Sequence, residues 1–490
     1  MESLKQQHQK AAVANTAAAA AVVLLDRRFN LFENVPVAQG SPHVRQITIR
    51  PNANWKTQPG SPAVHTIDFQ VPKFDSLLID TASFNVHMRS RVIHEDGTVP
   101  AKDTKFAVIN AIGVTAFSYV SVQIGNEFIC GENKHSVLAT YLSYMLNSSA
   151  EAKRTILRHA IVYAEDDAGH FDDVSLPTVP GGDADGAGAA GTVTINQAVN
   201  NSGFVHRNRV YEEGKIVYTV GRLDYSLSNL AKLLIPSAAV RISLKLNDSD
   251  FLLMYDPREV TPKLVFDVED IYITCNAHVL EPEIMASITR ALVQENQLAR
   301  YHFQRPQLAG PFHIGTTSQK HSITVFRNNP PALCFVFMCE QAALQNNPRR
   351  NPLNFINPHY RSISVSVESN TYPLGVGFEF RPDAFNISAN KAQCQEAYLE
   401  LFRVMRQQFA GSNSGLTMEK FLDGYTVIPI ALSSLLPSSD YSLPAMSGDT
   451  VLNFELEDNL PADCSLFVLG IVDSWIYLDV YSGVLKNYLK

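Results

Sequence analysis

The densest group of titratable side chains is the run Glu165-Asp166-Asp167-Ala168-Gly169-His170-Phe171-Asp172-Asp173, which carries five carboxyl groups. Hard divalent cations take several oxygen ligands from one loop, so this composition is compatible with a calcium or magnesium site. The spacing of the carboxyl groups does not match an EF-hand loop, and short motifs are weak predictors of sites. We therefore interpret the run as a solvated acidic loop and predict no metal-binding residues.

A second polar cluster, Asn346-Asn347-Pro348-Arg349-Arg350-Asn351-Pro352-Leu353-Asn354-Phe355, contains paired arginines that could contact phosphate. Its Asn and Pro residues more simply favour a structured turn before a strand that begins near Arg361. The 14 histidines are dispersed, and most are expected to be polar strand or loop residues. A pI near 6.0 also argues against an evenly basic nucleic-acid binder, so no specific nucleic-acid site is predicted.

Sequence signatures of catalysis are missing from the chain. It has no Gly-x-x-x-x-Gly-Lys, His-Glu-x-x-His or Gly-x-Ser-x-Gly motif. One formal Gly-x-Gly-x-x-Gly, at Gly186, Gly188 and Gly191, lies within the Gly/Ala-rich stretch 181–191 and follows no predicted strand, so we interpret it as part of a flexible surface loop. The sequence therefore predicts no catalytic residues, no cofactor-binding residues and no cofactor, and a protein that is not an enzyme.

The six cysteines form no Cys-x-x-Cys pair and no zinc-like cluster; they are Cys130, Cys275, Cys334, Cys339, Cys394 and Cys464. We expect reduced, mostly buried thiols in a protein that is made in the cell interior and is not secreted. Cys334 and Cys339 are five residues apart in an apolar run, which sends their side chains to opposite faces of a strand. Both are expected to be core residues.

Composition narrows the function classes further. With 46% hydrophobic residues, the chain is not disordered, and it has no apolar run of 18 residues that would cross a bilayer as a helix. Charged residues make up 18%, against about 25% in typical domains. A low-charge surface suits a protein that buries much of itself against other copies, because interface centres are depleted in charge.

The N-terminal segment differs from the rest of the chain. Lys5 and Lys10 precede an Ala-rich stretch, 11–25, that partly resembles a secretory signal. Because Asn15 and Thr16 interrupt that stretch, we interpret residues 1–28 as an arm that is mobile or folds conditionally. Residues 29–62 are rich in Pro, Gly and Asn, which extends the expected arm to residue 62.

From about residue 63 the apolar residues recur with a period of two, which predicts half-buried strands. The clearest alternating sets lie at residues 84–88, 120–124, 240–246, 363–367 and 452–456. Gly125-Asn126 between 120–124 and 127–130 is a hairpin signal. The sequence therefore predicts a mainly antiparallel β fold.

Three stretches have the apolar spacing of helices, at residues 137–145, 284–292 and 397–409. The first and the third occupy similar positions within the two halves of the β pattern, and the second lies between the halves. We therefore predict an N-terminal arm at 1–62, a first β-domain at 63–281, a connecting helix at 282–298 and a second β-domain at 299–490. In the second helix Ile284, Ile288 and Leu292 share one stripe, which predicts that they pack between the two domains.

Several strings, in a fixed order, resemble the double-jelly-roll (hexon-like) major capsid proteins of Polinton/Maverick elements and adintovirus-like viruses. The first half matches from residue 77 to 173, through Leu78-Ile79-Asp80, Phe117 to Asn126, Tyr141 to Tyr144 and Asp167 to Asp172. Downstream the resemblance continues at Gly221 to Asp224, Val240 to Leu244, Asn351 to Phe355 and Asp423 to Thr426. It spans about residues 64–482 and excludes the Ala-rich start and the Gly/Ala loop.

The resemblance implies two tandem eight-stranded jelly rolls and a structural role in the virion shell of a double-stranded DNA virus. Three chains would form a pseudo-hexameric trimer that tiles an icosahedral capsid. The expected partners are the chain itself, neighbouring capsomers and a penton or minor capsid protein, and contact of the arm with an internal membrane stays open. The resemblance also implies that the acidic run is a structural segment.

Two alternatives stay open from the sequence. A tandem β-sandwich protein that binds or acts on carbohydrate would need a pair of carboxylates across a cleft or an aromatic platform. Only two tryptophans are present, Trp55 in the expected arm and Trp475 in the last apolar strand, although Tyr and Phe are plentiful. The other alternative is a host-genome copy of a capsid gene with a changed role, which the sequence does not separate from a virion protein.

Overall fold

The computed structural model describes most of the chain beyond residue 42, and the structural statements below concern these residues. They are 43–52, 55, 66–72, 77–125, 127–129, 133–163, 166–175, 201–224, 226–228, 230–235, 240–373, 377–380, 394–408, 411–434, 436–438, 442–444, 446–478 and 485–488. The predictions for residues 1–28, for the loop 181–191 with Gly186, Gly188 and Gly191, and for Cys130 lie outside the described residues.

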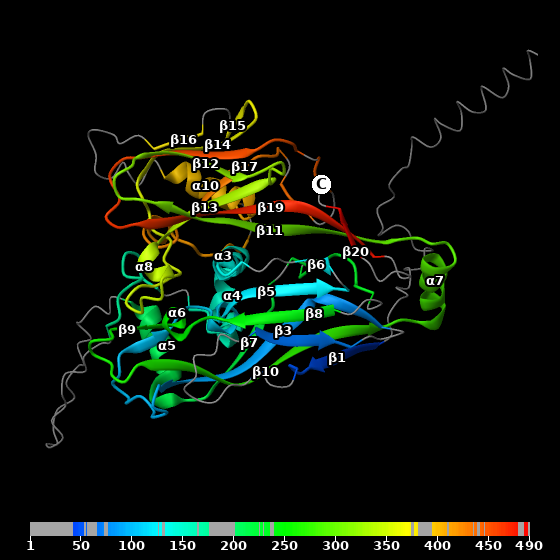
Figure 1. Cartoon of the computed structure of the whole chain (residues 1–490), viewed down its shortest axis with the longest axis horizontal. Helices are drawn as coiled ribbons and strands as arrows, with labels where there is room; N and C mark the ends of the chain where they lie inside the picture. Colours follow the sequence, from blue (N-terminus) through cyan, green and yellow to red (C-terminus); the bar gives the residue numbers. More distant parts are fainter. Residues whose placement is uncertain are drawn as a thin grey trace, which may run out of the picture. The chain divides into compact units, whose positions relative to one another are not determined.

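The first half of the chain forms two four-stranded antiparallel sheets, here called the first sandwich (Figure 1). Its strands are β1 (His43–Ile49), β2 (Thr66–Val71), β3 (Leu77–His94), β5 (Phe117–Ile124), β6 (Glu127–Phe128), β7 (Val217–Arg222), β8 (Val240–Leu246) and β10 (Leu264–Val279). The outer sheet has the order β1-β10-β3-β7, and the inner sheet has the order β2-β8-β5-β6. A short pair, β4 (Phe106–Val108) and β9 (Leu253–Tyr255), lies beside them.

The second half repeats this plan as the second sandwich. Its strands are β11 (Ala299–Ile314), β12 (Lys320–Phe326), β13 (Leu333–Glu340), β14 (Tyr360–Val367), β15 (Asn370–Tyr372), β16 (Phe378–Glu379), β17 (Ile428–Ala431), β18 (Thr450–Leu456), β19 (Cys464–Leu478) and β20 (Leu485–Tyr488). The inner sheet has the order β11-β19-β13-β17 with β20 on β19, and the outer sheet has the order β12-β18-β14-β15 with β16 on β14.

Alternation explains why these residues form sandwiches. In β3 the side chains of Phe84, Val86 and Met88 are buried, whereas Asn85 and His87 between them are partly exposed. Burying one face of each strand against the opposite sheet removes apolar surface from water and leaves polar side chains outside. The alternating sets predicted in β8, β14 and β18 are confirmed, as is the hairpin that joins β5 to β6.

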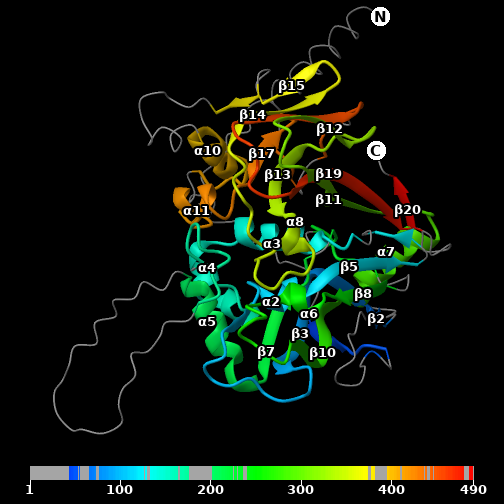
Figure 2. The same cartoon turned by 60° about the vertical axis from the view of Figure 1, so that its left-hand side comes forward.

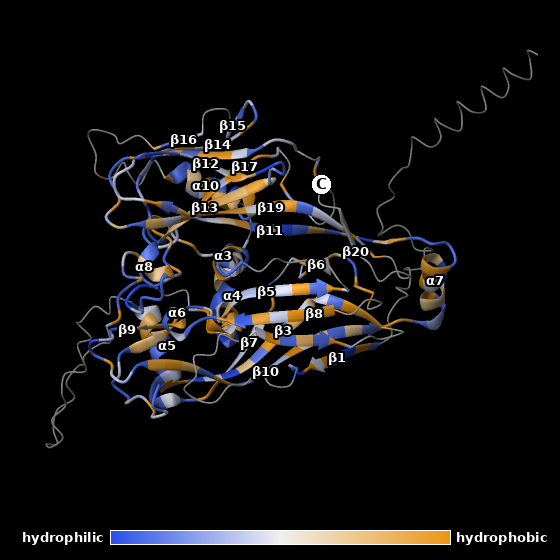
Figure 3. Ribbon diagram, viewed as in Figure 1, coloured by the Kyte–Doolittle hydropathy of each residue, from blue (hydrophilic) through white to orange (hydrophobic). Residues whose placement is uncertain are grey.

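Strand β13 is different, because seven of its eight residues are buried, including Cys334 and Cys339. Figure 3 shows this strand coloured apolar, in contrast to the alternating colours of β10. A strand that is covered on both faces has a continuous apolar sequence rather than an alternating one. The inner sheet of the second sandwich is therefore covered by its own sandwich on one side and by the first sandwich on the other.

Short helices fill the ends and the space between the sandwiches. They are α2 (Ile112–Thr115), α3 (Ser136–Asn147), α4 (Ala150–Arg154), α5 (Ser202–Tyr211), α6 (Ser249–Leu252), α7 (Pro282–Val293), α8 (Gln341–Leu344), α10 (Gln395–Val404) and α11 (Met418–Leu422), with 3-10 turns η2 (Ile156–Ala160) and η3 (Glu212–Gly214). The three predicted helices correspond to α3, α7 and α10. α10 ends at Val404, earlier than the apolar spacing predicted, and Phe409 lies outside the described residues.

The predicted arm differs from the structure at its end. Strand β1, at residues 43–49, pairs along its whole length with β10 as an edge strand of the outer sheet. Only Ile49 of β1 is buried, and the other residues are exposed or partly exposed. The sequence of β1 therefore lacks the apolar alternation that predicts a strand. The first sandwich therefore begins near residue 43 rather than 63.

The connecting helix α7 lies at one end of the two sandwiches, between β10 and β11 (Figure 1). In the described part of the chain, strands up to β10 pair only among themselves, and so do strands from β11 onward. We therefore propose α7 as the domain boundary. Leu292 is buried, but Ile284 and Ile288 are only partly buried in this single chain, so their packing between the domains stays a prediction for an assembled form.

Candidate functional site at the junction of the sandwiches

The two inner sheets face each other across helix α3 (Figure 1 and Figure 2). Just before α3, the Asn133 side chain donates a hydrogen bond of 3.3 Å to the backbone carbonyl of Leu308 in β11. The His135 ring lies 5.4 Å from the ring of Phe467 in β19. The acidic run, the start of α5, residues 351–355 and residues 423–425 meet nearby, and we call this group the polar junction.

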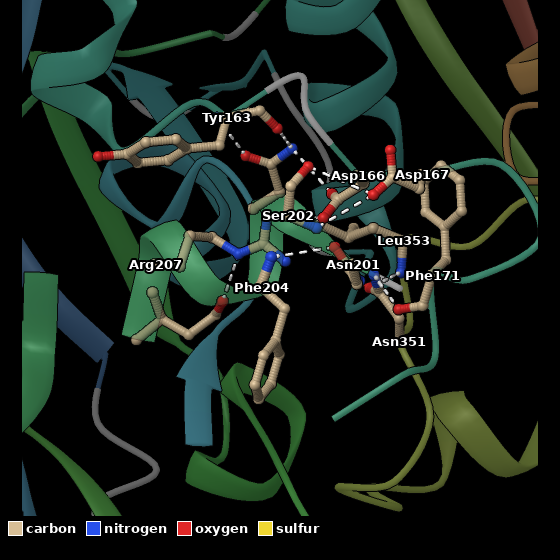
Figure 4. Close-up of polar contacts among 12 residues, drawn as sticks. Tyr163, Asp166, Asp167, Phe171, Asn201, Ser202, Phe204, Arg207, Asn351 and Leu353 are labelled. Carbon is tan, nitrogen blue, oxygen red and sulfur yellow. Dashed lines mark hydrogen bonds and ion pairs between the residues drawn. The ribbon is translucent and has the colours of Figure 1, made fainter. Parts of the chain in front are cut away.

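A buried ion pair lies at the centre of the polar junction (Figure 4). The Asp166 Oδ1 atom is 2.9 Å from Arg207 Nη1, and the two side chains are 1% and 0% exposed. Arg207 Nε also donates to the carbonyl of Val108 at 2.9 Å, which fixes the guanidinium plane. Residue 203 at the start of α5 must be glycine, because a Cβ there would lie 2.3 Å from Asp166 Oδ1.

Two tyrosine hydroxyl groups connect the sandwiches directly. Tyr141 in α3 and Tyr425 of the second half share a hydrogen bond of 2.7 Å, and both side chains are buried. Burial raises the pKa of both phenols above the ordinary value, so both stay neutral over the physiological range. Asn110 donates to the Tyr163 carbonyl at 2.6 Å and to the Tyr141 hydroxyl at 3.3 Å, which ties this contact to the first sandwich.

The end of the acidic run binds the second half of the chain. Asp172 accepts hydrogen bonds from the backbone N–H of Asn351 at 2.7 Å and from the Asn354 side chain at 3.2 Å. The Asn351 side chain in turn donates to the carbonyl of Phe171 at 3.3 Å. Each polar group of this contact therefore takes its partner from a segment about 180 residues away in the sequence.

Aromatic packing also joins the acidic run to the second half of the chain. The Phe171 ring meets the Tyr425 ring edge-on at 4.9 Å. Gly424 has a φ of +133°, and a Cβ at this position would lie 2.0 Å from the Phe171 ring. Glycine is therefore required twice over at residue 424, for its backbone conformation and for the close approach of the ring.

A buried lysine forms a further link. Lys153 in α4 is 2% exposed and donates to the backbone carbonyls of Met145 at 2.5 Å and of Ser414, in the second half, at 2.7 Å. Burial, together with the smaller effect of the nearby cation Lys420, lowers the pKa of Lys153 to about 7. The backbone N–H of Ala150 donates to the Asn413 carbonyl at 2.8 Å, so α4 is held to the second half at two points.

The acidic run is therefore not the solvated loop that we expected. Asp166 is buried against Arg207, Asp167 accepts from the Ser202 N–H at 3.1 Å, and Asp172 holds the second half. Its composition suggested solvent exposure because carboxylates are almost never fully buried unless they are paired, and the partners lie far away in the sequence. Among the described residues, no group of three or more His, Cys, Asp or Glu side chains has metal-binding geometry.

The paired arginines of the second cluster also have protein partners. Arg349 lies 3.5 Å from an Asp256 carboxyl oxygen, and Arg350 lies 3.3 Å from both Asp172 and Glu340. They form a structured turn before β14, as the Asn and Pro residues predicted. The five described cysteines are free thiols, and burial raises the pKa of each, to about 12 for Cys275 and Cys464, which makes them unreactive.

Sequence reasoning missed the residues that matter most at this junction. Arg207 and Lys153 carry no local signal, because each lies in a segment of ordinary polar composition, whereas Tyr425 lies in the string 423–426 that resembles capsid proteins but was assigned no role. The available hints were Gly424, within a string already matched to capsid proteins, and the density of the acidic run. What this arrangement does chemically is to join the two β-sandwiches through buried hydrogen bonds.

Comparisons with known proteins agree with this fold. No protein-family model and no curated protein sequence matches the chain. A chain in the cryo-EM structure of the Sputnik virophage is similar, with a TM-score of 0.55 and 10% identity over 96% of this chain and 93% of that chain. A chain of the PBCV-1 virus capsid has a TM-score of 0.55 and 9% identity over 94% and 99% of the two chains.

The Faustovirus major capsid protein is similar as well, with a TM-score of 0.50 and 9% identity, covering 94% of this chain and 93% of that chain. At these identities the likeness concerns the fold. The prediction of a mainly β protein with two jelly-roll halves is confirmed, because the alignments run through both sandwiches and nearly the whole length of the viral chains.

Proposed function

We propose that this chain is a major capsid protein, a structural subunit that forms trimeric, pseudo-hexameric capsomers and tiles an icosahedral shell. The single observation that carries the proposal is the presence of two β-sandwiches of the same plan, fixed together by the polar junction, over the full length of viral capsid chains. Two similar bodies per chain give a trimer six similar sides, so that it can pack among six neighbours.

The free faces of the two outer sheets support this proposal. Within one chain, the two inner sheets already face each other. In a ring of three chains, an outer sheet of one chain would therefore pack against an outer sheet of the next chain. Such a head-to-tail contact closes into a ring when the rotation fits. The outer sheet of the second sandwich offers a polar face, on which Ser322 and Ser366 are both hydrogen bonded to Asn453, at 2.8 and 3.1 Å. On the same face Lys320 and Arg361 both form ion pairs with Glu455, at 3.2 and 3.1 Å.

The outer sheet of the first sandwich offers an aromatic face. The Tyr218 and Tyr272 hydroxyls are 2.9 Å apart, and the His87 ring stacks on the Tyr272 ring at 4.6 Å. Tyr218 is 50% exposed in the single chain. Tyrosine is enriched in protein interfaces because it buries a large area and keeps a polar end. We propose that these two faces meet between neighbouring chains of the trimer.

The finer assignment is also a proposal. The order of short strings supports a capsid protein of the Polinton/Maverick and adintovirus-like lineage, placed in the virion shell and made in the host cell. Its partners would be copies of itself, neighbouring capsomers and a penton or minor capsid protein. The polar junction supports a role without an active site, since its buried side chains bind one another.

The test is the mass of the purified protein by light scattering, followed by electron microscopy of the same sample. Three copies of the 54.2 kDa chain, about 163 kDa, with six-sided outlines or closed shells, are expected. A stable monomer over a wide range of salt and pH would contradict the proposal.

One observation favours the alternative of a carbohydrate-binding protein. On β19 the Trp475 and Tyr477 rings stack at 6.4 Å with an interplanar angle of 18°, and the Arg300 guanidinium lies 5.9 Å from the Tyr477 ring. A glycan array separates the two functions, because only a sugar-binding protein would lose binding in Trp475→Ala.

A further inference from the structure

On the outer sheet of the first sandwich, both ring nitrogens of His87 in β3 contact hydroxyl groups. The Nδ1 atom lies 2.5 Å from the Tyr218 hydroxyl of β7, and the Nε2 atom lies 2.8 Å from Thr274 Oγ1 of β10. The Tyr218 hydroxyl lies a further 2.9 Å from the Tyr272 hydroxyl of β10. Four side chains from three neighbouring strands therefore form one hydrogen-bonded chain on this face.

The direction of these hydrogen bonds depends on the protonation of His87. A neutral imidazole has one donor nitrogen and one acceptor nitrogen, whereas a protonated imidazole donates from both. In the neutral form, one of the two contacting hydroxyls therefore donates to the ring. In the protonated form the ring donates to both hydroxyls, and the Tyr218 hydroxyl is left to donate to Tyr272 or to solvent. Protonation therefore changes the hydrogen bonds that this face offers to a neighbour.

The charged groups around His87 already have partners. The His87 ring stacks on the Tyr272 ring at 4.6 Å, and the Arg50 guanidinium lies 4.8 Å from the centroid of the same ring. A protonated His87 would therefore bring a second cation to a ring that already holds Arg50. Among the described residues, no carboxyl group forms a hydrogen bond or an ion pair with His87. The charged side chains nearby, which follow β1 or lie on β3, β7 and β10, are bonded as follows: Arg50 to Asp270 at 3.2 Å, Arg89 to Glu269 at 3.4 Å, and Arg222 to the Ser228 carbonyl at 2.6 Å.

Burial lowers the pKa of His87 below its ordinary value already in the single chain, because a charged ring loses solvation. Contact with a neighbouring chain would bury the ring further and lower this pKa again. On the proposed partner face, the Glu455 carboxyl group is already paired with Lys320 and Arg361, at 3.2 and 3.1 Å. An assembled chain would therefore bind this proton less readily than a free chain, and association should weaken as the pH falls through the pKa of His87 in the free chain.

We propose that His87 makes the contact between neighbouring chains sensitive to pH, so that chains associate in neutral solution and separate in mildly acidic solution. This inference rests on the proposed function, because it needs the outer sheet of the first sandwich to lie between chains. With neutral His87, the aromatic face packs against the neighbour without burying a further charge. The protonated ring adds a cation beside Arg50 and redirects the Tyr218 hydroxyl, and both changes disfavour the contact.

The test is the mass of the full chain by light scattering from about pH 8 to about pH 5, the range in which histidine titrates, at constant ionic strength and with circular dichroism to check folding. We expect trimers at the higher pH and a loss of association of up to about tenfold per pH unit at each interface as His87 is protonated. His87→Gln removes the titrating group and should keep trimers at the lower pH. His313→Gln makes the same change at an exposed histidine of β11, in the inner sheet of the second sandwich, and should dissociate like the unmodified chain.

A second measurement needs no substitution. Exchange of the C2 hydrogen of the His87 ring, read by mass spectrometry, reports the pKa of this one histidine, which should be lower in the trimer than in the same chain diluted to monomers. An equal pKa in both forms, trimers at both ends of the pH range, or equal dissociation of His87→Gln and the unmodified chain would overturn this inference and leave the proposed function standing. A chain that stays monomeric at the higher pH would contradict the proposed function itself, and this inference with it.

Discussion

The Asp166–Arg207 pair gives the sharpest prediction. The variant Asp166→Asn keeps the size of the side chain but leaves the Arg207 guanidinium, which is 0% exposed, without a countercharge. Breaking a buried pair by removing one partner costs about 3–5 kcal/mol, because the remaining charge stays out of water. We therefore expect the free energy of unfolding to fall by about 3 kcal/mol or more.

A surface pair at a similar distance is the matched control. Lys105 and Glu259 are 3.0 Å apart and their side chains are 44% and 53% exposed. Glu259→Gln makes the same carboxylate-to-amide change in high dielectric, where an ion pair contributes only about 0–1 kcal/mol. Comparing the loss in free energy of unfolding of the two variants therefore separates the effect of burial from the effect of losing a negative charge.

The assay is urea unfolding of the purified subunit, followed by tryptophan fluorescence and circular dichroism, with a double-mutant cycle. The double variant Asp166→Asn/Arg207→Met also removes the unpaired guanidinium charge. Its loss in free energy of unfolding should be about 1–3 kcal/mol smaller than the sum of the losses in the two single variants. A cost below about 1 kcal/mol for Asp166→Asn, or strict additivity in the cycle, would refute the argument that this pair holds the polar junction.

Three further predictions concern the assembly, the buried lysine and the junction glycine. Tyr218→Glu places a charge on the exposed aromatic face and should convert trimers to monomers in light scattering while the circular dichroism spectrum stays unchanged; persistent trimers would argue against this interface. The pKa of Lys153, about 7 when folded, lies below its unfolded value, so burial disfavours the charged form. Stability should therefore rise with pH from about 7 to about 10, by roughly 1 kcal/mol per pH unit, and Lys153→Met should lack this rise in urea titrations. Gly424→Ala should cost more than about 2 kcal/mol because its Cβ meets the Phe171 ring, whereas Gly97→Ala, also at positive φ but in open space, should cost about 1 kcal/mol; equal losses would exclude the steric argument.

Local pattern predicted much of the frame. Val240, Ile242 and Leu244 alternate with polar residues, and a period of two can only bury one face of a strand, so their burial followed from the sequence. The helix α3 followed from its apolar stripe in the same way. Strand β1 escaped prediction because it is an exposed edge strand whose pairing with β10 depends on backbone hydrogen bonds rather than on apolar side chains.

The acidic run is the clearest case where local reasoning failed. Its five carboxyl groups suggested water as their partner, yet Arg207 lies 41 residues away from Asp166 and Asn351 lies 179 residues away from Asp172. No local pattern predicts which distant donor will reach a carboxylate. The resemblance to capsid proteins, which depends on the order of many strings, came closer by indicating a structural segment.

The sequence by itself determined a mainly β chain with two similar halves, because burial periodicity and turn residues act over a few neighbours and can be read locally. Only the tertiary structure decided how the halves are joined: the Tyr141–Tyr425 hydrogen bond and the buried position of Lys153. The physical reason is that a buried polar group exists only when surfaces from distant segments enclose it. Its free energy is therefore a property of the packed halves rather than of any one stretch of sequence.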